Sequence, residues 1–193
     1  MTRAIRLLVW AEVALLGLLT ASGLYLNWFY RPTALHAYAF AEASRLQTSV
    51  RIAHAVRALH LVASFGFIWI GAVFALVCIV GAVRSTREVS RRVAAFATGF
   101  AVVALAASFT GYLLPWSQLA LFAVTVGANF HGAWDAAFSE QVRFVIVHST
   151  EVSQTTYRNW FLAHTLLLPA VVVTLLVTLA RAVRASALPD EPS

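Results

Sequence analysis

The sequence predicts an all-α integral membrane protein, built as a bundle of four spanning helices. Of its 193 residues, 61% are hydrophobic and only 11% are charged, and the mean hydropathy is +0.79. A water-soluble domain carries about 25% charged residues, so this chain cannot cover a surface that faces water. Four mostly apolar stretches each have the roughly 20 residues that a membrane-crossing helix needs. These stretches are Leu7–Phe29, Ala58–Val83, Val93–Leu114 and Trp160–Ala180.

The first stretch begins like a secretory signal peptide, with a basic start followed by apolar residues in MTRAIRLLVW. Its apolar part continues to Phe29, which is longer than the core of a signal peptide, and no A-x-A cleavage site follows. We therefore expect a retained first span. Residues 1–184 then form one transmembrane domain, and residues 185–193 form a disordered cytoplasmic tail.

The long link between the third and fourth spans contains two further apolar stretches, Leu119–Phe130 and Phe138–His148. Each is expected to lie along the membrane interface as a short helix. Aromatic side chains gather at membrane–water interfaces, where their apolar rings and polar tips are both satisfied. We expect such a belt from Trp116, Trp134, Tyr157 and Trp160.

All of the basic residues are arginines, and they flank the spans instead of forming one patch. This pattern indicates anchoring to the lipid bilayer and argues against nucleic-acid binding. Eight arginines lie at the N-terminus, between the second and third spans, and after the fourth, while six are spread through the longer links on the other side. The positive-inside rule then places both termini in the cytoplasm of a multi-pass inner (plasma) membrane protein. The single cysteine, Cys78, excludes a disulfide framework, a zinc knuckle and a C-x-x-C-H haem attachment.

Two of the six histidines lie about one turn inside an apolar span, His60 in the second and His164 in the fourth. An ionisable side chain is costly there and marks a candidate functional site. Both spans run in the same direction, so the two histidines reach the same depth, next to Gly23 and Gly111 at the ends of the other two spans. Imidazole is a good metal ligand and glycine allows close approach, which favours a slot for a flat macrocycle. The alternative is two hydrogen-bonded buried histidines, with glycines that serve helix packing.

The other histidines carry less information. His54 lies just before the second span and remains ambiguous, and the rest are expected to be solvated or interfacial in the outer links. These are His36, His131 and His148.

Four local motifs resemble the N-terminal four-helix half of the cytochrome b family, as in the cytochrome bc and bf complexes. The second span contains R-x-x-H followed by A-S, starting at Arg57, and the third ends in GYLLPWSQ, starting at Gly111. The fourth contains HTLLLP, starting at His164, and the first ends in SGLYL around Gly23. The motifs occur in the family's order on the corresponding helices, and the GYLLPWSQ motif is the most specific.

The resemblance implies one low-spin haem b on the outer side, with His60 and His164 as its axial ligands. Arg57 would pair with a haem propionate, since a guanidinium fork suits a carboxylate. The family's second arginine lies five residues before the ligand of the fourth span, where this chain has Asn159, and Arg158 is one residue earlier. The residues implied to contact the cofactor are Gly23, Arg57, Ser64, Gly111, Tyr112, Pro115 and Arg158.

A second, inner haem of the family has no counterpart here. Its ligands would lie fourteen residues further along the second and fourth spans, about 21 Å away. Those positions hold Phe74 and Thr178, and the matching glycine positions hold Val9 and Ala97. Replacement of all four predicts a one-haem protein whose inner half is packed with side chains.

Three functions are compatible with this reading. The first is an electron-transfer subunit of a larger oxidoreductase, which links membrane quinones to a partner on the outer, periplasmic face. The partner could be an iron–sulfur protein, a molybdenum enzyme, a hydrogenase or a c-type cytochrome. The second is the haem half of a reduced quinol-oxidising cytochrome bc-like complex, which would need a further membrane subunit with a P-E-W-Y-type loop. The third is a haem-free anchoring or assembly subunit.

One carboxylate, Glu12, falls in the inner half of the first span. It could be a proton or quinone contact on the cytoplasmic side. We favour the alternative that it lies near enough to the surface to reach Arg3 or Arg6.

Overall fold

The computed structural model describes residues 2–32, 36–49, 52–84, 91–120, 122–123 and 154–185. Within this part of the chain, four helical segments are long and apolar enough to cross a membrane. The first three are α1 (Thr2–Phe29), α3 (Ala53–Val83) and α4 (Arg91–Leu113). The fourth is continuous and consists of α8 (Gln154–Leu162), the π-helical turn η1 (Ala163–Leu167) and α9 (Leu168–Ala185). The predicted all-α membrane bundle is confirmed.

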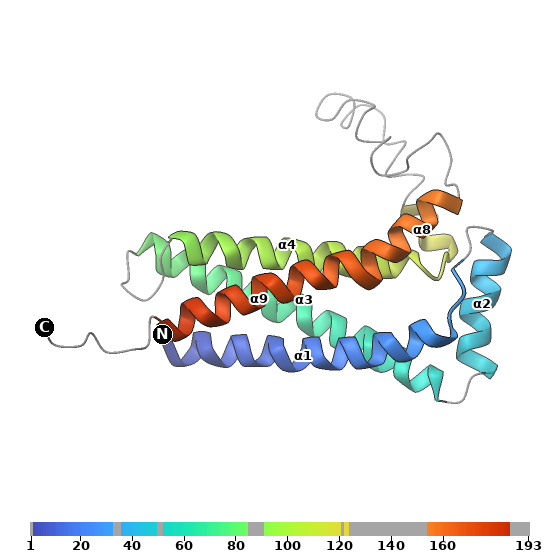
Figure 1. The fold of residues 1–193 in the computed structure, drawn as a ribbon, viewed down its shortest axis with the longest axis horizontal. Helices are drawn as coiled ribbons and strands as arrows, with labels where there is room; N and C mark the ends of the chain where they lie inside the picture. The colour runs from blue at the N-terminus through green and yellow to red at the C-terminus, as the bar shows by residue number, and fades with distance from the viewer. Residues whose placement is uncertain are drawn as a thin grey trace, which may run out of the picture.

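The four spans lie side by side and form a closed ring in the order α1, α3, α4 and α9 (Figure 1). The start of α1 and the end of α9 lie at the same end of the bundle, which we call the terminal end. The opposite end, where α8 lies, is called the histidine end. Helix α3 begins at Ala53, five residues before the predicted Ala58, because helical hydrogen bonding extends toward the N-terminus beyond the apolar stretch. The fourth span likewise begins at Gln154 instead of Trp160.

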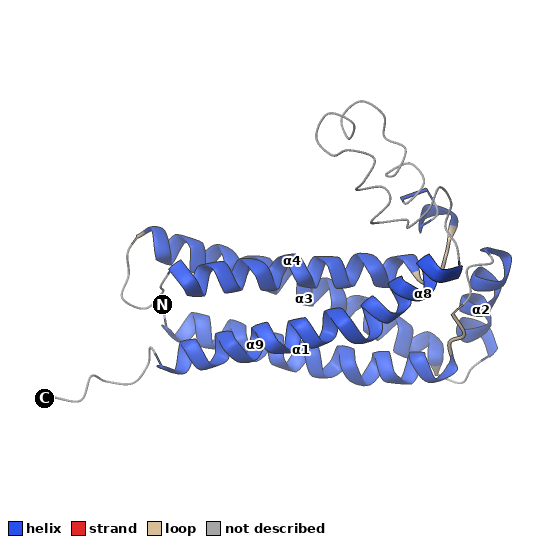
Figure 2. Cartoon of the chain, turned by 45° about the horizontal axis from the view of Figure 1, so that its top comes forward, coloured by secondary structure: helices blue, strands red, loops and turns tan. Residues whose placement is uncertain are grey.

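A helix that the sequence did not reveal, α2 (His36–Ser49), runs across the histidine end of the bundle (Figures 1 and 2). Its face toward the protein consists of small and apolar side chains, including Ala39 and Leu46. Arg45 ties it to α1 by donating a hydrogen bond of 3.0 Å to the carbonyl of Phe29. Arg45 also pairs with Glu42, and this hydrogen bond lowers the pKa of the Glu42 carboxyl. The Arg45 side chain is exposed and that of Glu42 is only partly buried, so the pair contributes little to stability.

The half of the bundle toward the terminal end is filled by one cluster of buried side chains from all four spans. Phe100 and Phe74 are completely buried in it, and Phe67 meets Phe100 edge to face with ring centroids 5.3 Å apart. Many large apolar side chains point outward instead, as expected for helices that face lipid. The buried members are Ile5, Val9, Phe67, Phe74, Ala75, Cys78, Ala94, Ala97, Phe100, Ala104, Val172, Leu176, Leu179 and Val183.

Glu12 is the exception in this half, because its carboxyl is fully buried. Neither of its oxygens has a hydrogen-bond partner among the described residues. Arg3 and Arg6 are both exposed on the outside of α1. The interpretation that Glu12 pairs with one of these arginines is therefore wrong. Successive residues of a helix are about 100° apart around its axis, so exposed and buried positions alternate along α1. Glu12 lies on the side of α1 that faces the bundle interior, away from lipid and water.

A second buried cluster closes the histidine end and corrects the expected aromatic belt. Trp116, Tyr157 and Trp160 are almost completely buried. Trp116 meets Tyr157 edge to face and Trp160 at a tilt, with ring centroids 5.9 and 5.7 Å apart. They pack against one another and do not line the membrane interface. Among the described tryptophans, the strongly exposed ones are Trp10, Trp28 and Trp69. Trp134 lies outside the described residues.

Other predictions also fall outside the described part of the chain. They concern the interfacial stretch Phe138–His148, most of Leu119–Phe130, the histidines His131 and His148, and the tail beyond Ala185. They remain predictions.

Candidate functional site: two facing imidazoles

His60 and His164 face each other across the bundle from α3 and η1. Their ring centroids are 6.3 Å apart and the ring planes cross at 71°. They belong to the histidine end, as matched depth on two parallel spans predicts. The two rings are in contact although their residues are 104 positions apart in sequence (164 − 60), so it is the fold that brings them together. The structure therefore brings together the two predicted ligands.

The two predicted glycines lie directly against these rings. A methyl group added at Gly111 would meet Cε1 of His164 at 2.5 Å, and one added at Gly23 would meet Cε1 of His60 at 3.3 Å. The resemblance assigns these glycines to the edges of a haem, and in the structure the nearest side chains are the imidazoles themselves. The glycines thus allow α1 and α4 to approach the two histidines closely.

The hydrogen bonds of each imidazole indicate which of its two ring nitrogens carries the proton and which keeps a lone pair. Nδ1 of His164 lies 2.8 Å from the carbonyl oxygen of Ala107, which can only accept, so this nitrogen carries the proton. Nδ1 of His60 lies 2.8 Å from the Ser22 hydroxyl. The carbonyl oxygen of Leu18, 2.7 Å from that hydroxyl, can only accept, so we assign the hydroxyl's one proton to it and the Nδ1 proton to His60. Both Nε2 atoms are left as unprotonated lone-pair donors, the arrangement that metal-binding histidines adopt.

His164 lies in η1, where the helix widens by one residue. Pro169 cannot donate a backbone hydrogen bond, and its ring crowds the carbonyl four residues earlier, at Thr165. The backbone responds with a π-helical turn, closed by a bond from the N–H of Leu168 to the carbonyl of Ala163. Such turns recur at functional sites because they re-aim one side chain. The proline was visible in the sequence, but the turn that it produces was not foreseen.

The described residues contain no group of three or more metal-ligating side chains. A metal at this site would therefore receive two ligands from the protein and the others from its own macrocycle. Metal–imidazole bonds of about 2 Å, plus about 1 Å from each nitrogen to its ring centre, would separate the centroids by about 6 Å. The observed 6.3 Å matches this separation. The donor set, the free Nε2 atoms and the spacing all fit a bis-histidine haem.

The remaining predicted site residues surround this pair less closely. Arg57 is half-buried on α3, one turn before His60, and Pro115 is half-buried in the turn that follows α4. Ser64 donates its hydroxyl proton to the carbonyl of Leu61 on its own helix, at 2.7 Å. Tyr112 and Arg158 are exposed, the first at the end of α4 and the second on α8. The structure therefore unites the two histidines and the two glycines more tightly than the other five residues.

Sequence reasoning missed a pair of tyrosines above the site. The hydroxyls of Tyr30 and Tyr157 lie within hydrogen-bond distance of each other and of the carbonyl oxygen of Leu114, and their two protons are shared among these contacts. Burial raises the pKa of the Tyr30 hydroxyl, which keeps it protonated as a donor. The carbonyl is available because it lies in the turn after α4, next to Trp116, whose φ of 49° is rare for a residue with a side chain. The three groups come from three separate segments, so no local sequence pattern predicts that they are in contact.

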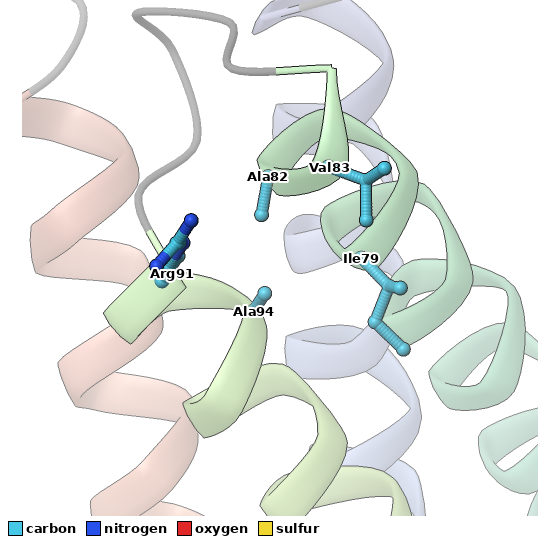
Figure 3. A pocket seen from close by; sticks show the side chains of 5 residues that line it. All are labelled: Ile79, Ala82, Val83, Arg91 and Ala94. Carbon is cyan, nitrogen blue, oxygen red and sulfur yellow. The ribbon is translucent and has the colours of Figure 1, made fainter.

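One hollow elsewhere on the molecule is separate from the site. It holds about 420 Å³ at the terminal end, between the last turns of α3 and the start of α4 (Figure 3). Ile79 lies nineteen residues along α3 from His60 (79 − 60), about 28 Å away. The hollow contains none of the predicted site residues, and its lining is Ile79, Ala82, Val83, Arg91 and Ala94.

The fold and the site together define a multi-pass membrane protein with a paired-imidazole site suited to a macrocyclic metal group. A family model described as Cytochrome b/b6/petB matches residues 8–185. Because this match covers most of the chain, the protein belongs to the cytochrome b family. Membership implies haem b as the cofactor and electron transport in a membrane as the general function.

Relatives and solved structures agree with this assignment. The chain is 28% identical over 157 residues to the cytochrome b6 of Heliobacterium mobile, which covers 81% of this chain and 71% of the relative. It is 30% identical over 154 residues to the menaquinol:cytochrome c reductase cytochrome b subunit of Bacillus subtilis strain 168, covering 77% of this chain and 65% of the relative.

A chain of a hyperthermophilic respiratory complex III has the same fold, with a TM-score of 0.78 at 22% identity. That alignment covers 97% of this chain and 48% of the other, so the present chain spans about half the length of this structural relative.

Proposed function

We propose that this chain is a one-haem cytochrome b, which passes electrons between a membrane quinone and a redox partner at the histidine end. The proposal rests above all on one observation: two imidazoles face each other 6.3 Å apart, each with Nε2 free. Bis-histidine ligation gives a low-spin haem whose ligands stay in place during electron transfer. The cofactor would supply the redox change, and the protein would supply the ligands, the burial and the docking face.

The state of the inner layer supports a single haem. Val9, Phe74 and Ala97, at three of the four positions that would hold or admit a second haem, are buried in the packed core of the terminal end. At the fourth, the hydroxyl of Thr178 donates to the carbonyl of Thr174 on its own helix. A macrocycle at that level would have to displace two aromatic rings, since Phe100 is also completely buried there. One haem site, near one end of the bundle, remains.

The proposed haem would be held by residues beyond its ligands. Arg57, one turn before His60, is assigned to a propionate, and Arg158 is a weaker candidate because it is exposed on α8. Ser64, Tyr112 and Pro115 would line the cofactor or, for Tyr112, an adjoining quinone site. Gly23 and Gly111 keep the imidazoles close to α1 and α4.

The direction of the chain in the membrane follows from its arginines. The terminal end carries Arg3, Arg6, Arg84, Arg91, Arg92, Arg181 and Arg184 among the described residues, all of them exposed. The positive-inside rule assigns that end to the cytoplasm of the inner membrane, and the histidine end to the periplasmic side. A haem there is accessible to an outer partner such as an iron–sulfur, molybdenum, hydrogenase or c-type cytochrome subunit.

The relatives favour a second candidate, the haem half of a reduced quinol-oxidising complex. One of them is named as a subunit of a menaquinol:cytochrome c reductase, and this chain covers 65% of its length. In that case another membrane subunit must complete the quinol site. Isolation of the native complex separates the two candidates, because only the second requires that additional subunit. A haem-free anchoring role is the third possibility, and it predicts no haem absorption at all.

The test is a sided redox experiment on the chain in proteoliposomes. A menaquinol analogue is expected to reduce the haem, and a membrane-impermeant oxidant is expected to reoxidise it rapidly from the histidine end alone. Equal reoxidation from both sides would contradict the proposed position of the haem. Absence of quinol reduction, with a haem spectrum intact, would contradict the quinone assignment.

Ser22→Ala is expected to weaken the His60 ligand without removing it. The substitution deletes the hydroxyl that accepts the Nδ1 hydrogen bond of His60, at 2.8 Å. Loss of such an outer contact typically weakens metal binding by about 10–100-fold. Haem retention and midpoint potential should both change, measured by haem transfer to apomyoglobin and by redox titration.

Thr20→Ala is the matched control for this prediction. Its hydroxyl also bonds within α1, to the carbonyl of Leu16 at 2.8 Å, but it is exposed and distant from His60. Equal effects of the two substitutions would assign the result to α1 stability instead of the ligand.

A further inference from the structure

We infer that Glu12 is a proton-binding site inside the membrane, whose protonation is coupled to the redox state of the His60–His164 site. The inference goes beyond the proposed function and depends on it only for the presence of the haem. Its first support is burial. The carboxyl is completely inaccessible to solvent, and neither oxygen has a hydrogen-bond partner among the described residues.

The immediate surroundings of the carboxyl are apolar. Oε1 lies 3.5 Å from where a methyl group on Gly71 of α3 would stand, and the ring of Phe100 on α4 closes the same space at 3.2 Å. Gly71 thus provides the room that the carboxyl occupies. An ionised carboxylate in such a place loses its hydration without compensation, which is strongly unfavourable. The neutral acid avoids this cost, so Glu12 is protonated in the resting protein.

Among the residues that the structure describes, the charged and titratable groups on the surrounding helices offer no counter-ion at this level. The core on α3 contributes the Cys78 thiol, which is buried, and the core on α4 contributes Phe100, Ala97 and Ala104. The core on α9 contributes Val172, Leu176, Leu179 and Val183. The arginines of α1, α4 and α9 are exposed at the terminal end, and Arg184 lies over the Trp10 ring, 5.8 Å from its centroid.

Glu12 lies between the proposed haem and the terminal end. It is eleven residues from Gly23 on α1 (23 − 12), and its neighbour Gly71 is eleven residues from His60 on α3 (71 − 60). Both spacings correspond to about 16 Å along the bundle. The start of α1 at Thr2 is ten residues away (12 − 2), about 15 Å. The other end of α1, at Phe29, is seventeen residues away (29 − 12), about 26 Å, so water at the terminal end is the nearer source of a proton.

This position allows electrostatic coupling at a useful strength. Two unit charges about 16 Å apart, at an effective dielectric constant near 20, change each other's binding constant about fivefold. At pH values where Glu12 is ionised while the proposed haem is oxidised, addition of one electron at the His60–His164 site would favour uptake of one proton from water by Glu12, which then becomes the neutral acid. When the electron leaves for the outer partner or the quinone pool, the proton is released. A fivefold change corresponds to about 40 mV in midpoint potential for a one-electron couple.

The test uses the full chain in nanodiscs and combines two measurements. Infrared spectroscopy at neutral pH should detect the carbonyl stretch of a protonated carboxylic acid, which disappears in Glu12→Gln and persists in Glu42→Gln. Glu42 is the matched control because its carboxylate lies on α2 and is paired with Arg45. This first measurement needs no haem, so it remains informative even if the proposed function fails.

The second measurement is the haem midpoint potential as a function of pH. In the wild type it should fall as the pH rises through the range in which the infrared band disappears. In Glu12→Gln it should stay constant over that range, and Glu12→Asp should restore the slope. Absence of the band from the wild type at neutral pH would overturn the protonated state. Identical pH profiles for wild type and Glu12→Gln would overturn the coupling.

Discussion

His60→Ala and His164→Ala are each expected to abolish the low-spin haem spectrum and to reduce haem content to under about one tenth of wild type. The ring centroids of the two imidazoles lie 6.3 Å apart, and the two would be the protein ligands of the metal, so the loss of either would leave the metal with one protein ligand. Neither neighbour can substitute, since the Ser22 hydroxyl and the Ala107 carbonyl, which bond the two Nδ1 atoms, do not replace an imidazole as a low-spin haem ligand. The measurement is the absorption spectrum of the purified protein, reduced and oxidised.

His54→Ala is the matched control for this prediction. His54 also lies on α3, six residues before His60 (60 − 54), but its side chain is exposed. Its substitution should leave the spectrum unchanged. A normal low-spin spectrum in either His60→Ala or His164→Ala would show that the ligands lie elsewhere in the chain.

Gly111→Ala is expected to produce the second largest effect, although it adds only one methyl group. That methyl would stand 2.5 Å from Cε1 of His164, a distance at which something must move. The imidazole cannot retreat freely, because its Nδ1 is bonded to the carbonyl of Ala107 on the same helix as Gly111. Overpacking of this kind costs about 1–3 kcal/mol, which would lower haem retention by roughly 5- to 150-fold.

The chain supplies controls on the same helices. Gly99→Ala, also on α4, adds a methyl group with nothing within 4 Å and should leave haem binding intact. On α1, Gly23→Ala should have a smaller effect than Gly111→Ala, because its methyl would meet His60 at 3.3 Å, and Gly17→Ala should have none. If Gly99→Ala and Gly111→Ala lost haem equally, helix packing in general would explain the loss.

The four spans could be predicted because their signal is local and strong. A run of apolar residues of membrane length has one common solution, a spanning helix, in which every backbone group is satisfied within the segment. The ends were less predictable, since α3 and the fourth span both begin several residues before their apolar part. Helix α2 was missed because its buried side consists mainly of small residues such as Ala39 and Ala43, with Leu46 as a larger apolar member.

The site was predictable in its chemistry and less so in its geometry. Ionisable residues at matched depths in two parallel spans identified His60 and His164, and family motifs identified the glycines beside them. The roles of Ser22 and Ala107 depend on which faces of α1 and α4 turn toward the histidines, and no local pattern gives that. The same reason explains Glu12, whose depth was clear from the sequence but whose direction was not.

The π-helical turn illustrates a third kind of limit. Pro169 predicts a local disturbance of the fourth span, but not whether the helix kinks, breaks or widens. In the structure it widens over Ala163–Leu167, the turn that carries His164. The position of the His164 side chain therefore depends on how the fourth span packs against α4, which cannot be predicted from the sequence alone.

The central claim is one haem per chain, held by His60 and His164 at one end of the bundle. A pyridine haemochrome assay on the purified chain, combined with quantitative amino-acid analysis, measures this directly. We expect one haem b per chain. Two haems would contradict the packed inner layer around Phe74, and no haem would contradict the paired-imidazole site.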